Sequence, residues 1–148
     1  MPPLPEWGGF WLPMSEIKFP ASFEYLDEIR EFVGHAGHAA GFTDKDVYSI
    51  QLAADEAVSN VIEHAYEGIL DAFFELTCIY ENNRLILTLV DHGKSFDLTK
   101  VAEPDLKADL SKRKIGGLGI YLMRKLMDEV SYKVTNKGNI LTLIKMKE

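Results

Sequence analysis

The sequence predicts a two-layer α/β sandwich, in which helices cover one face of a mixed, mostly antiparallel sheet. Apolar residues recur with a 3.6-residue period through most of residues 21–67, and then alternate with a period of two through 72–91 and 130–145. The alternating segments come in pairs joined by short turns, so hairpins build most of the sheet. With 148 residues, 47% of them hydrophobic, the chain has the length of one domain and enough apolar side chains for its core.

The first elements are an arm, a short strand and two helices. Residues 1–15 are rich in Pro, Gly and Trp and predict an irregular arm, with the domain following at 16–148. Residues 16–20 predict a strand that Pro20 confines to an edge or ends. A helix is expected over 21–40 and ends at Gly41. Thr43 caps a second helix, which continues to about residue 67 and stops at Gly68.

The later elements are two hairpins separated by a loop and a helix. Residues 72–80 and 84–91 predict the first hairpin. Residues 94–117 have little periodicity, and so long a loop inside a compact domain is usually functional or mobile. A glycine-rich turn then leads into a helix over about 118–127. Strands over 130–135 and 140–145 complete the domain.

Composition and charge exclude several classes of protein. The formal net charge of −7 argues against a general nucleic-acid binder. The single cysteine, Cys78, allows no internal disulfide, which fits a reducing cytoplasm. No apolar run reaches the roughly 18 residues that span a membrane, and the N-terminus lacks the pattern of a signal peptide. We therefore expect a cytoplasmic protein that acts without a membrane and without direct nucleic-acid contact.

A line of polar residues borders the apolar face of the second helix. Glu56, Asn60 and His64 follow one another at a spacing of four residues. The carbonyl oxygen of Asn is a hard ligand suited to Mg²⁺, and Glu one turn away can take a proton from a hydroxyl group. Spacing alone favours a solvated helix edge, and His64 by itself is interpreted as structural. The line nevertheless has the composition of one wall of a ligand cleft.

Two further motifs contain residues that suit a nucleotide. Asp91 ends an apolar strand, where a carboxylate can accept a hydrogen bond from the amino group of adenine, and Gly93 lets the chain pass close to a flat ring. The Gly116–Gly119 turn opens a helix, where free N–H groups and the helix dipole favour phosphate. Taken singly, an ordinary turn explains each motif. The glycine turn is neither a Rossmann nor a Walker fingerprint.

Together and in this order, the three motifs resemble those of the GHKL ATPases, the superfamily of gyrase, histidine kinases and MutL. The residues of the three motifs are most similar to those of RsbW-type anti-sigma factors, which are small serine protein kinases. The resemblance covers about residues 16–147. It is carried by Asp55–Asn60 with His64–Tyr66, by Asp91-His92-Gly93 with Phe96-Asp97, and by Gly116–Ile120 with Leu126–Val130.

The resemblance implies the Bergerat fold and a site for ATP and Mg²⁺. Asn60 would coordinate the metal, and Glu56 would be the catalytic base that activates a substrate serine. Asp91 would bind the adenine amino group, with Gly93 beneath the ring. The backbone of Gly117, Leu118 and Gly119 would meet the phosphates. Residues 94–116 would form a lid over the nucleotide.

This chain departs from the family pattern at two positions. Ser95 stands where the motif after the strand often has a second glycine. In the last hairpin the family often has a Gly-Thr pair that helps to hold adenine, whereas here Asn139 follows Gly138. Thr142, on the same predicted strand, is the candidate to replace that threonine as a cofactor contact.

The function that the resemblance implies is an ATP-dependent serine protein kinase and anti-sigma regulatory factor. Its substrate would be an anti-anti-sigma partner with a STAS domain, a sigma factor would be a second partner, and a homodimer is expected. Two alternatives stay open: a nucleotide-binding partner-switch regulator without kinase activity, and a detached ATPase domain of the histidine-kinase type. A structural adaptor without nucleotide is the least favoured, because it leaves the glycine-rich turn unexplained.

Overall fold

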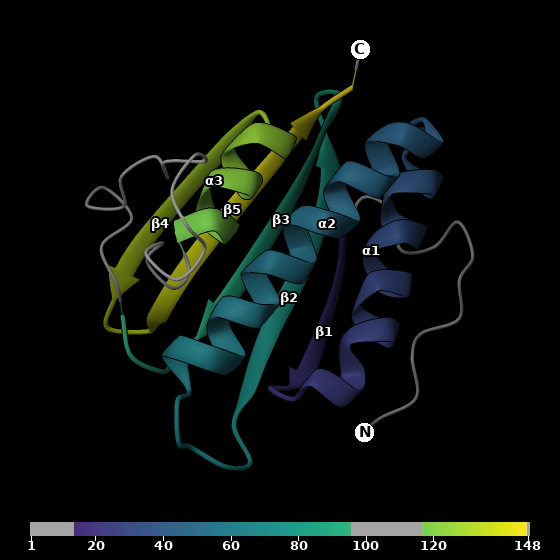
Figure 1. The fold of residues 1–148 in the computed structure, drawn as a ribbon. Helices are drawn as coiled ribbons and strands as arrows, with labels where there is room; N and C mark the ends of the chain where they lie inside the picture. The colour runs from purple at the N-terminus through teal and green to yellow at the C-terminus, as the bar shows by residue number, and fades with distance from the viewer. Residues whose placement is uncertain (1–13, 96–116, 148) are drawn as a thin grey trace.

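A computed structural model describes residues 14–95 and 117–147. In this part of the chain five strands form one sheet in the order β1-β2-β3-β5-β4, and every neighbouring pair is antiparallel. The helices lie on one face of the sheet (Figure 1). The predicted two-layer α/β class is confirmed, and the sheet is antiparallel throughout. The strands are β1 (Met14–Pro20), β2 (Phe73–Glu81), β3 (Arg84–Asp91), β4 (Glu129–Thr135) and β5 (Gly138–Met146).

Local signals in the sequence set most helix boundaries. The helical elements are the 3₁₀ turn η2 (Phe23–Tyr25), α1 (Leu26–Ala39), α2 (Asp44–Asn60), the π-helical turn η3 (Val61–Ala65) and α3 (Gly117–Leu126). The hydroxyl of Thr43 accepts a hydrogen bond from the backbone N–H of Asp46 at 3.2 Å, so it caps α2 as predicted. Gly41 and Gly68 follow the two long helices with φ of 86° and 74°, values that glycine adopts without strain.

Three predicted boundaries change because of contacts that are remote in sequence. Strand β1 begins at Met14, so Met14 and Ser15 leave the predicted arm to pair with Ile79 and Cys78 of β2. The first helix begins later than predicted, because the backbone N–H of Ala21 donates to the carbonyl of Ala72 at 2.8 Å. The second helix ends in a π turn, closed by a bond from the N–H of Tyr66 to the carbonyl of Val61 at 2.9 Å.

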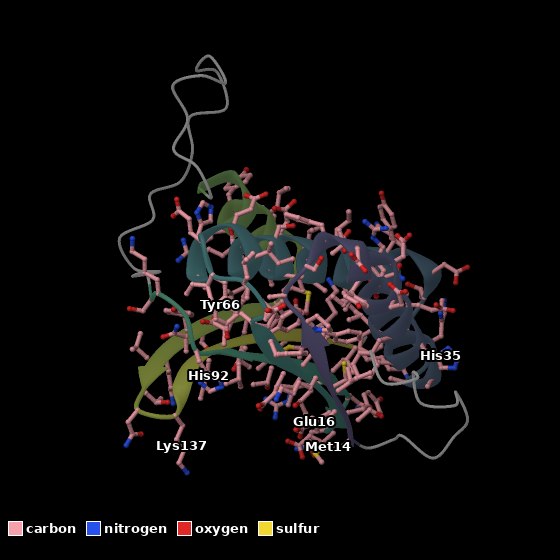
Figure 2. All side chains as sticks on the ribbon, turned by 90° about the horizontal axis from the view of Figure 1, so that it is seen from below. Met14, Glu16, His35, Tyr66, His92 and Lys137 are labelled. Atoms are coloured by element: carbon pink, nitrogen blue, oxygen red, sulfur yellow. The ribbon has the colours of Figure 1, made fainter. Side chains whose placement is uncertain are left out.

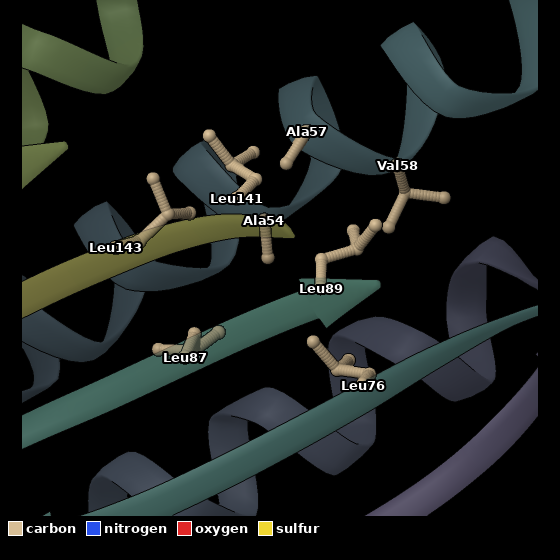
Figure 3. A pocket seen from close by; sticks show the side chains of 8 residues that line it. All are labelled: Ala54, Ala57, Val58, Leu76, Leu87, Leu89, Leu141 and Leu143. Carbon is tan, nitrogen blue, oxygen red and sulfur yellow. The ribbon is translucent and has the colours of Figure 1, made fainter. Parts of the chain in front are cut away.

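The core lies between the sheet and α2, which runs between α1 and α3 (Figure 1). The apolar face predicted for this helix is buried from Ile50 to Ala65, except that Ile62 at its edge is partly buried. A small cavity of about 10 Å³ remains beneath the helix (Figure 3), and its apolar walls leave a water molecule no partner. It is lined by Ala54, Ala57, Val58, Leu76, Leu87, Leu89, Leu141 and Leu143. Helix α2 therefore rests directly on β3 and β5.

Two points remain, on membrane-spanning helices and on the predicted segments that the structure does not describe. None of the described helices is both long enough and apolar enough to cross a membrane. Residues 1–13, the rest of the predicted arm, lie outside the described residues, as do residues 96–116, which make up most of the predicted lid.

Candidate functional site

The polar line on α2 and η3 contains buried atoms that lack partners. Glu56, Asn60 and His64 are all half-buried. Within the described part of the chain, Nδ2 of Asn60 and Nε2 of His64 are inaccessible to solvent and make no hydrogen bond. A buried polar group without a partner costs about 1–3 kcal/mol. Such atoms, side by side on one helix edge, are the expected mark of a site that a polar ligand completes.

The first turn of α3 lies against this line. A Cβ atom added to Gly119 would stand 2.7 Å from Oε2 of Glu56, so the backbone of α3 lies close to this carboxylate. Gly117 begins α3, and Leu118 follows it in the first turn. The free N–H groups of a helix N-terminus favour an anion. The structure therefore brings Glu56 and the glycine-rich turn to one place, as the motifs predict.

The surroundings of Glu56 favour its protonated form. Burial raises the pKa of the Glu56 carboxyl above its ordinary value, and the negative charges of Asp55 and Glu63 raise it further. A carboxylate with a raised pKa is a stronger proton acceptor, which suits a general base near neutral pH. Asp55 is held by Nε of Arg30 at 2.8 Å, and this bond ties α1 to α2 beside the site.

Asp91 forms the centre of a second, fully bonded group at the end of β3. Its side chain is only 4% exposed. Its Oδ1 accepts hydrogen bonds from the backbone N–H of Gly93 and from Nδ2 of Asn139, both at 2.9 Å. Its other oxygen accepts no bond from a described residue. The carboxylate is thus fixed by one oxygen, while the other can accept from a ligand.

Asn139, which sequence reasoning did not assign to the site, takes the position expected for Thr142. Asn139 pairs with Asp91 across β3 and β5, and it is 4% exposed on the helix-covered face. Thr142 pairs with Thr88, and both belong to the half-exposed set that alternates with the buried set. Because side chains alternate along a strand, Thr142 lies on the opposite face of the sheet from Asp91. The assignment of Thr142 to the adenine site is therefore wrong. The break in the Gly-Thr pair was the signal that pointed to Asn139.

Residues 92–94 form a strap that is held from both sides. The backbone N–H of Lys94 donates to the carbonyl of Ala65 at 2.7 Å, and a Cβ at Gly93 would overlap that same carbonyl. The hydroxyl of Tyr66 accepts from the backbone N–H of His92 at 2.7 Å, and Figure 2 shows these two residues at the same end of the molecule. On the other side, Nδ2 of Asn139 donates to the carbonyl of Gly93 at 2.9 Å. Only glycine fits at position 93.

These contacts connect the predicted site residues into one continuous region. It runs from Gly119 to Glu56, along α2 and η3 to Ala65, and across to Gly93 and Asp91. Among the described residues, no three His, Cys, Asp or Glu side chains gather to hold a metal ion. A metal in this region would take the amide oxygen of Asn60 together with oxygens of a ligand. The Asp91 carboxylate at one end of this region suits a base that donates a hydrogen bond, and the N-terminal turn of α3 at the other end suits phosphate. The region as a whole therefore suits a nucleotide.

Known proteins resemble this chain in sequence and in fold. Residues 19–145 match the family described as "Histidine kinase-like ATPase domain". The serine-protein kinases RsbW of Staphylococcus aureus strains MSSA476 and JH9 are each 33% identical over 125 residues, which is 78% of this chain and 76% of theirs. A crystal structure of the RsbU and RsbW domains of a Mycobacterium tuberculosis protein superposes with a TM-score of 0.63 at 17% identity. That match covers 90% of this chain and 32% of the other. The last similarity concerns the fold alone.

Proposed function

Because the chain belongs to the histidine kinase-like ATPase domain family, and within it to the RsbW serine-protein kinases, we propose that it is an ATP-dependent serine protein kinase. In this proposal it is an anti-sigma regulatory factor of the cytoplasm. Its substrate is a serine of an anti-anti-sigma partner with a STAS domain, and a sigma factor is its second partner.

The side chains present fit the chemistry of phosphoryl transfer, which depends on positioning and charge neutralisation. Mg-ATP would supply the phosphoryl group and the metal charge. Asn60 would hold the metal through its amide oxygen, and its Nδ2, which has no partner among the described residues, supports a ligand at this place. Glu56 would take the proton of the substrate hydroxyl. Asp91 would accept from the adenine amino group, with Gly93 beneath the ring.

The observation that carries the proposal is the approach of α3 to Glu56. The backbone at Gly117, Leu118 and Gly119 opens this helix. A Cβ atom on Gly119 would stand 2.7 Å from Oε2 of Glu56. Phosphate held at the helix N-terminus would therefore lie beside the proposed base. Proximity of this kind is what transfer to a hydroxyl requires.

The proposed homodimer has a candidate surface. The sheet face away from the helices bears half-exposed apolar side chains, namely Ile79, Ile86, Val90, Ile140 and Ile144. Figure 2 shows the helices gathered on the other side of the strands. Packing two such faces together would bury these residues. In sedimentation analysis we expect a dimer, and Ile86→Lys should shift it to monomer. A monomeric intact protein at micromolar concentration would contradict this part of the proposal.

The kinase assignment is tested by phosphotransfer to a STAS-domain protein encoded beside this chain. We expect transfer from Mg-ATP by the intact protein, and a loss of about 10²–10⁴-fold in Glu56→Gln with nucleotide binding retained. Glu67→Gln removes a carboxylate from an exposed position and is the matched control. Full activity in Glu56→Gln would refute the role of Glu56. Absence of transfer by the intact protein to any candidate would favour a regulator that binds nucleotide without transferring phosphate.

A further inference from the structure

At the base-binding end of the proposed nucleotide site, the side-chain amide of Asn139 and the backbone N–H of Gly93 donate hydrogen bonds to other groups of the protein. Both protons of the Asn139 amide have partners, Oδ1 of Asp91 and the carbonyl oxygen of Gly93, each at 2.9 Å. The backbone N–H of Gly93 donates to the same Oδ1, also at 2.9 Å. Neither the side-chain amide of Asn139 nor the backbone N–H of Gly93 therefore keeps a free proton for a ligand.

The orientation of the Asn139 amide follows from its neighbours. Turning the amide over would place its oxygen against a carboxylate oxygen and a carbonyl oxygen, and neither of these can donate. The amide oxygen and the second carboxylate oxygen of Asp91 accept no hydrogen bond from a described residue. Both residues are 4% exposed, so these groups lie at the inner end of the site. Among the described residues, the part of the site formed by Asp91, Gly93 and Asn139 therefore offers a ligand these acceptors and no side-chain donor.

The two purines differ in the edge that they offer to such a surface. Adenine has one donor, its 6-amino group, beside the acceptor N1, and N1 finds no donor among these three residues. Guanine has two adjacent donors, N1–H and the 2-amino group, and two acceptors are still open to them here, the second carboxylate oxygen of Asp91 and the amide oxygen of Asn139. A site rejects a wrong ligand strongly when buried polar groups are left unpaired, and here guanine leaves no donor of the protein unpaired.

We propose that this site binds purine nucleoside triphosphates with little discrimination between adenine and guanine, and that Asn139 is the residue responsible. The inference rests on the proposed function, because it concerns the nucleotide that the kinase uses. A hydroxyl at position 139 has one proton that rotates freely, so it can turn toward N1 of adenine. Asn139 has no such proton to spare.

The test is the ratio of dissociation constants for Mg-GTP and Mg-ATP, measured by calorimetry on the full chain, with Mg-UTP as the pyrimidine control. We expect ATP and GTP to bind within about 10-fold of each other, the value of a single hydrogen bond, and UTP to bind more weakly. Asn139→Thr should raise the preference for ATP by about 10-fold. Asn139→Ser carries the same hydroxyl on a smaller side chain, and it replaces the threonine variant if that one does not fold. Thr142→Val changes a hydroxyl on the opposite face and should leave the ratio unchanged.

The outcomes separate this inference from the kinase proposal. An intact protein that binds ATP on the order of 100-fold more tightly than GTP would overturn the inference and leave the kinase assignment standing. A ratio that does not move in either position-139 variant would overturn the role of Asn139. Failure of every purine nucleotide to bind would overturn the proposed function itself.

Discussion

The two ends of the site, one around Asp91 and the other along α2, differ in whether their polar groups are hydrogen-bonded within the protein. Around Asp91, every proton of Asn139 and Gly93 that faces the carboxylate is bonded within the protein, and the strap over residues 92–94 is held on two sides. Along α2 and η3, Nδ2 of Asn60 and Nε2 of His64 are buried without a partner in the described part of the chain, and Glu56 is partly desolvated.

This difference indicates a division of labour. The end around Asp91, called the base end because we propose that it binds the base, is preorganised, so it contributes to the stability of the fold whether or not a nucleotide is bound. At the α2 end, buried polar atoms lack partners among the described residues, which costs stability that a ligand would restore, and unsatisfied groups of this kind are typical of functional sites. Changes at the base end should therefore lower the free energy of unfolding, and changes at the α2 end should affect ligand binding with little cost to the fold.

The largest loss of stability is expected from Gly93→Ala. The new Cβ would overlap the backbone carbonyl of Ala65, which cannot move without breaking its bond to the N–H of Lys94. Overpacking against backbone should lower the free energy of unfolding by about 3 kcal/mol in urea denaturation without nucleotide. Gly68→Ala is the control, since its Cβ meets nothing within 4 Å and it suffers only from φ of 74°, a cost of about 1–2 kcal/mol. Equal losses in the two variants would contradict a rigid strap.

Asn139→Leu should come next. The substitution keeps the size of the side chain but removes two hydrogen bonds, one of them to a buried carboxylate. We expect the free energy of unfolding to fall by about 2 kcal/mol, measured in the same denaturation series. Asn136→Leu makes the same change in an exposed turn and should stay within about 0.5 kcal/mol of the intact protein. If Asn139→Leu is equally harmless, the base end is not preorganised.

Glu56→Gln should change stability in a pH-dependent manner. Because the folded state raises the pKa of Glu56, it binds that proton more tightly than the unfolded chain does. Its contribution is thus most favourable at low pH and is lost as the pH rises through the raised pKa. The variant should be more stable than the intact protein at pH 8, and the difference should vanish near pH 4, in parallel denaturation curves. Glu67→Gln controls for the change in net charge. An advantage for Glu56→Gln that grows toward low pH would contradict the desolvation of Glu56.

Asn60→Leu should have the smallest effect on the fold. It removes a buried amide nitrogen that has no partner among the described residues, and replacing such a group by an apolar one of similar shape is close to neutral, within about 1 kcal/mol. The rise in Tm that Mg-ATP produces in the intact protein should disappear. Both values come from thermal unfolding with and without Mg-ATP. A large loss of stability without nucleotide would show that the two ends do not differ as described.

The sequence predicted most of what depends on short-range spacing. The buried face of α2, its cap at Thr43 and its end before Gly68 follow from periodicity and from the stereochemistry of single residues. The first hairpin is also confirmed, with Asn82 and Asn83 at positive φ in its turn. The motifs on three separate elements were enough to select Glu56, Asn60, Asp91 and the glycine-rich turn as one site, because their order along the chain fits one fold.

The tertiary structure decided what depends on register and on contacts between distant segments. Asn139 and Thr142 lie on the same strand, and only its register against β3 shows that Asn139 faces Asp91 while Thr142 faces away. The same holds for the start of β1 at Met14, which its pairing with β2 determines. Periodicity states which residues share a face, but the partner across a sheet is set by packing of the whole core. By itself the sequence determined the elements and their motifs, and the fold then decided which side chain of β5 faces Asp91.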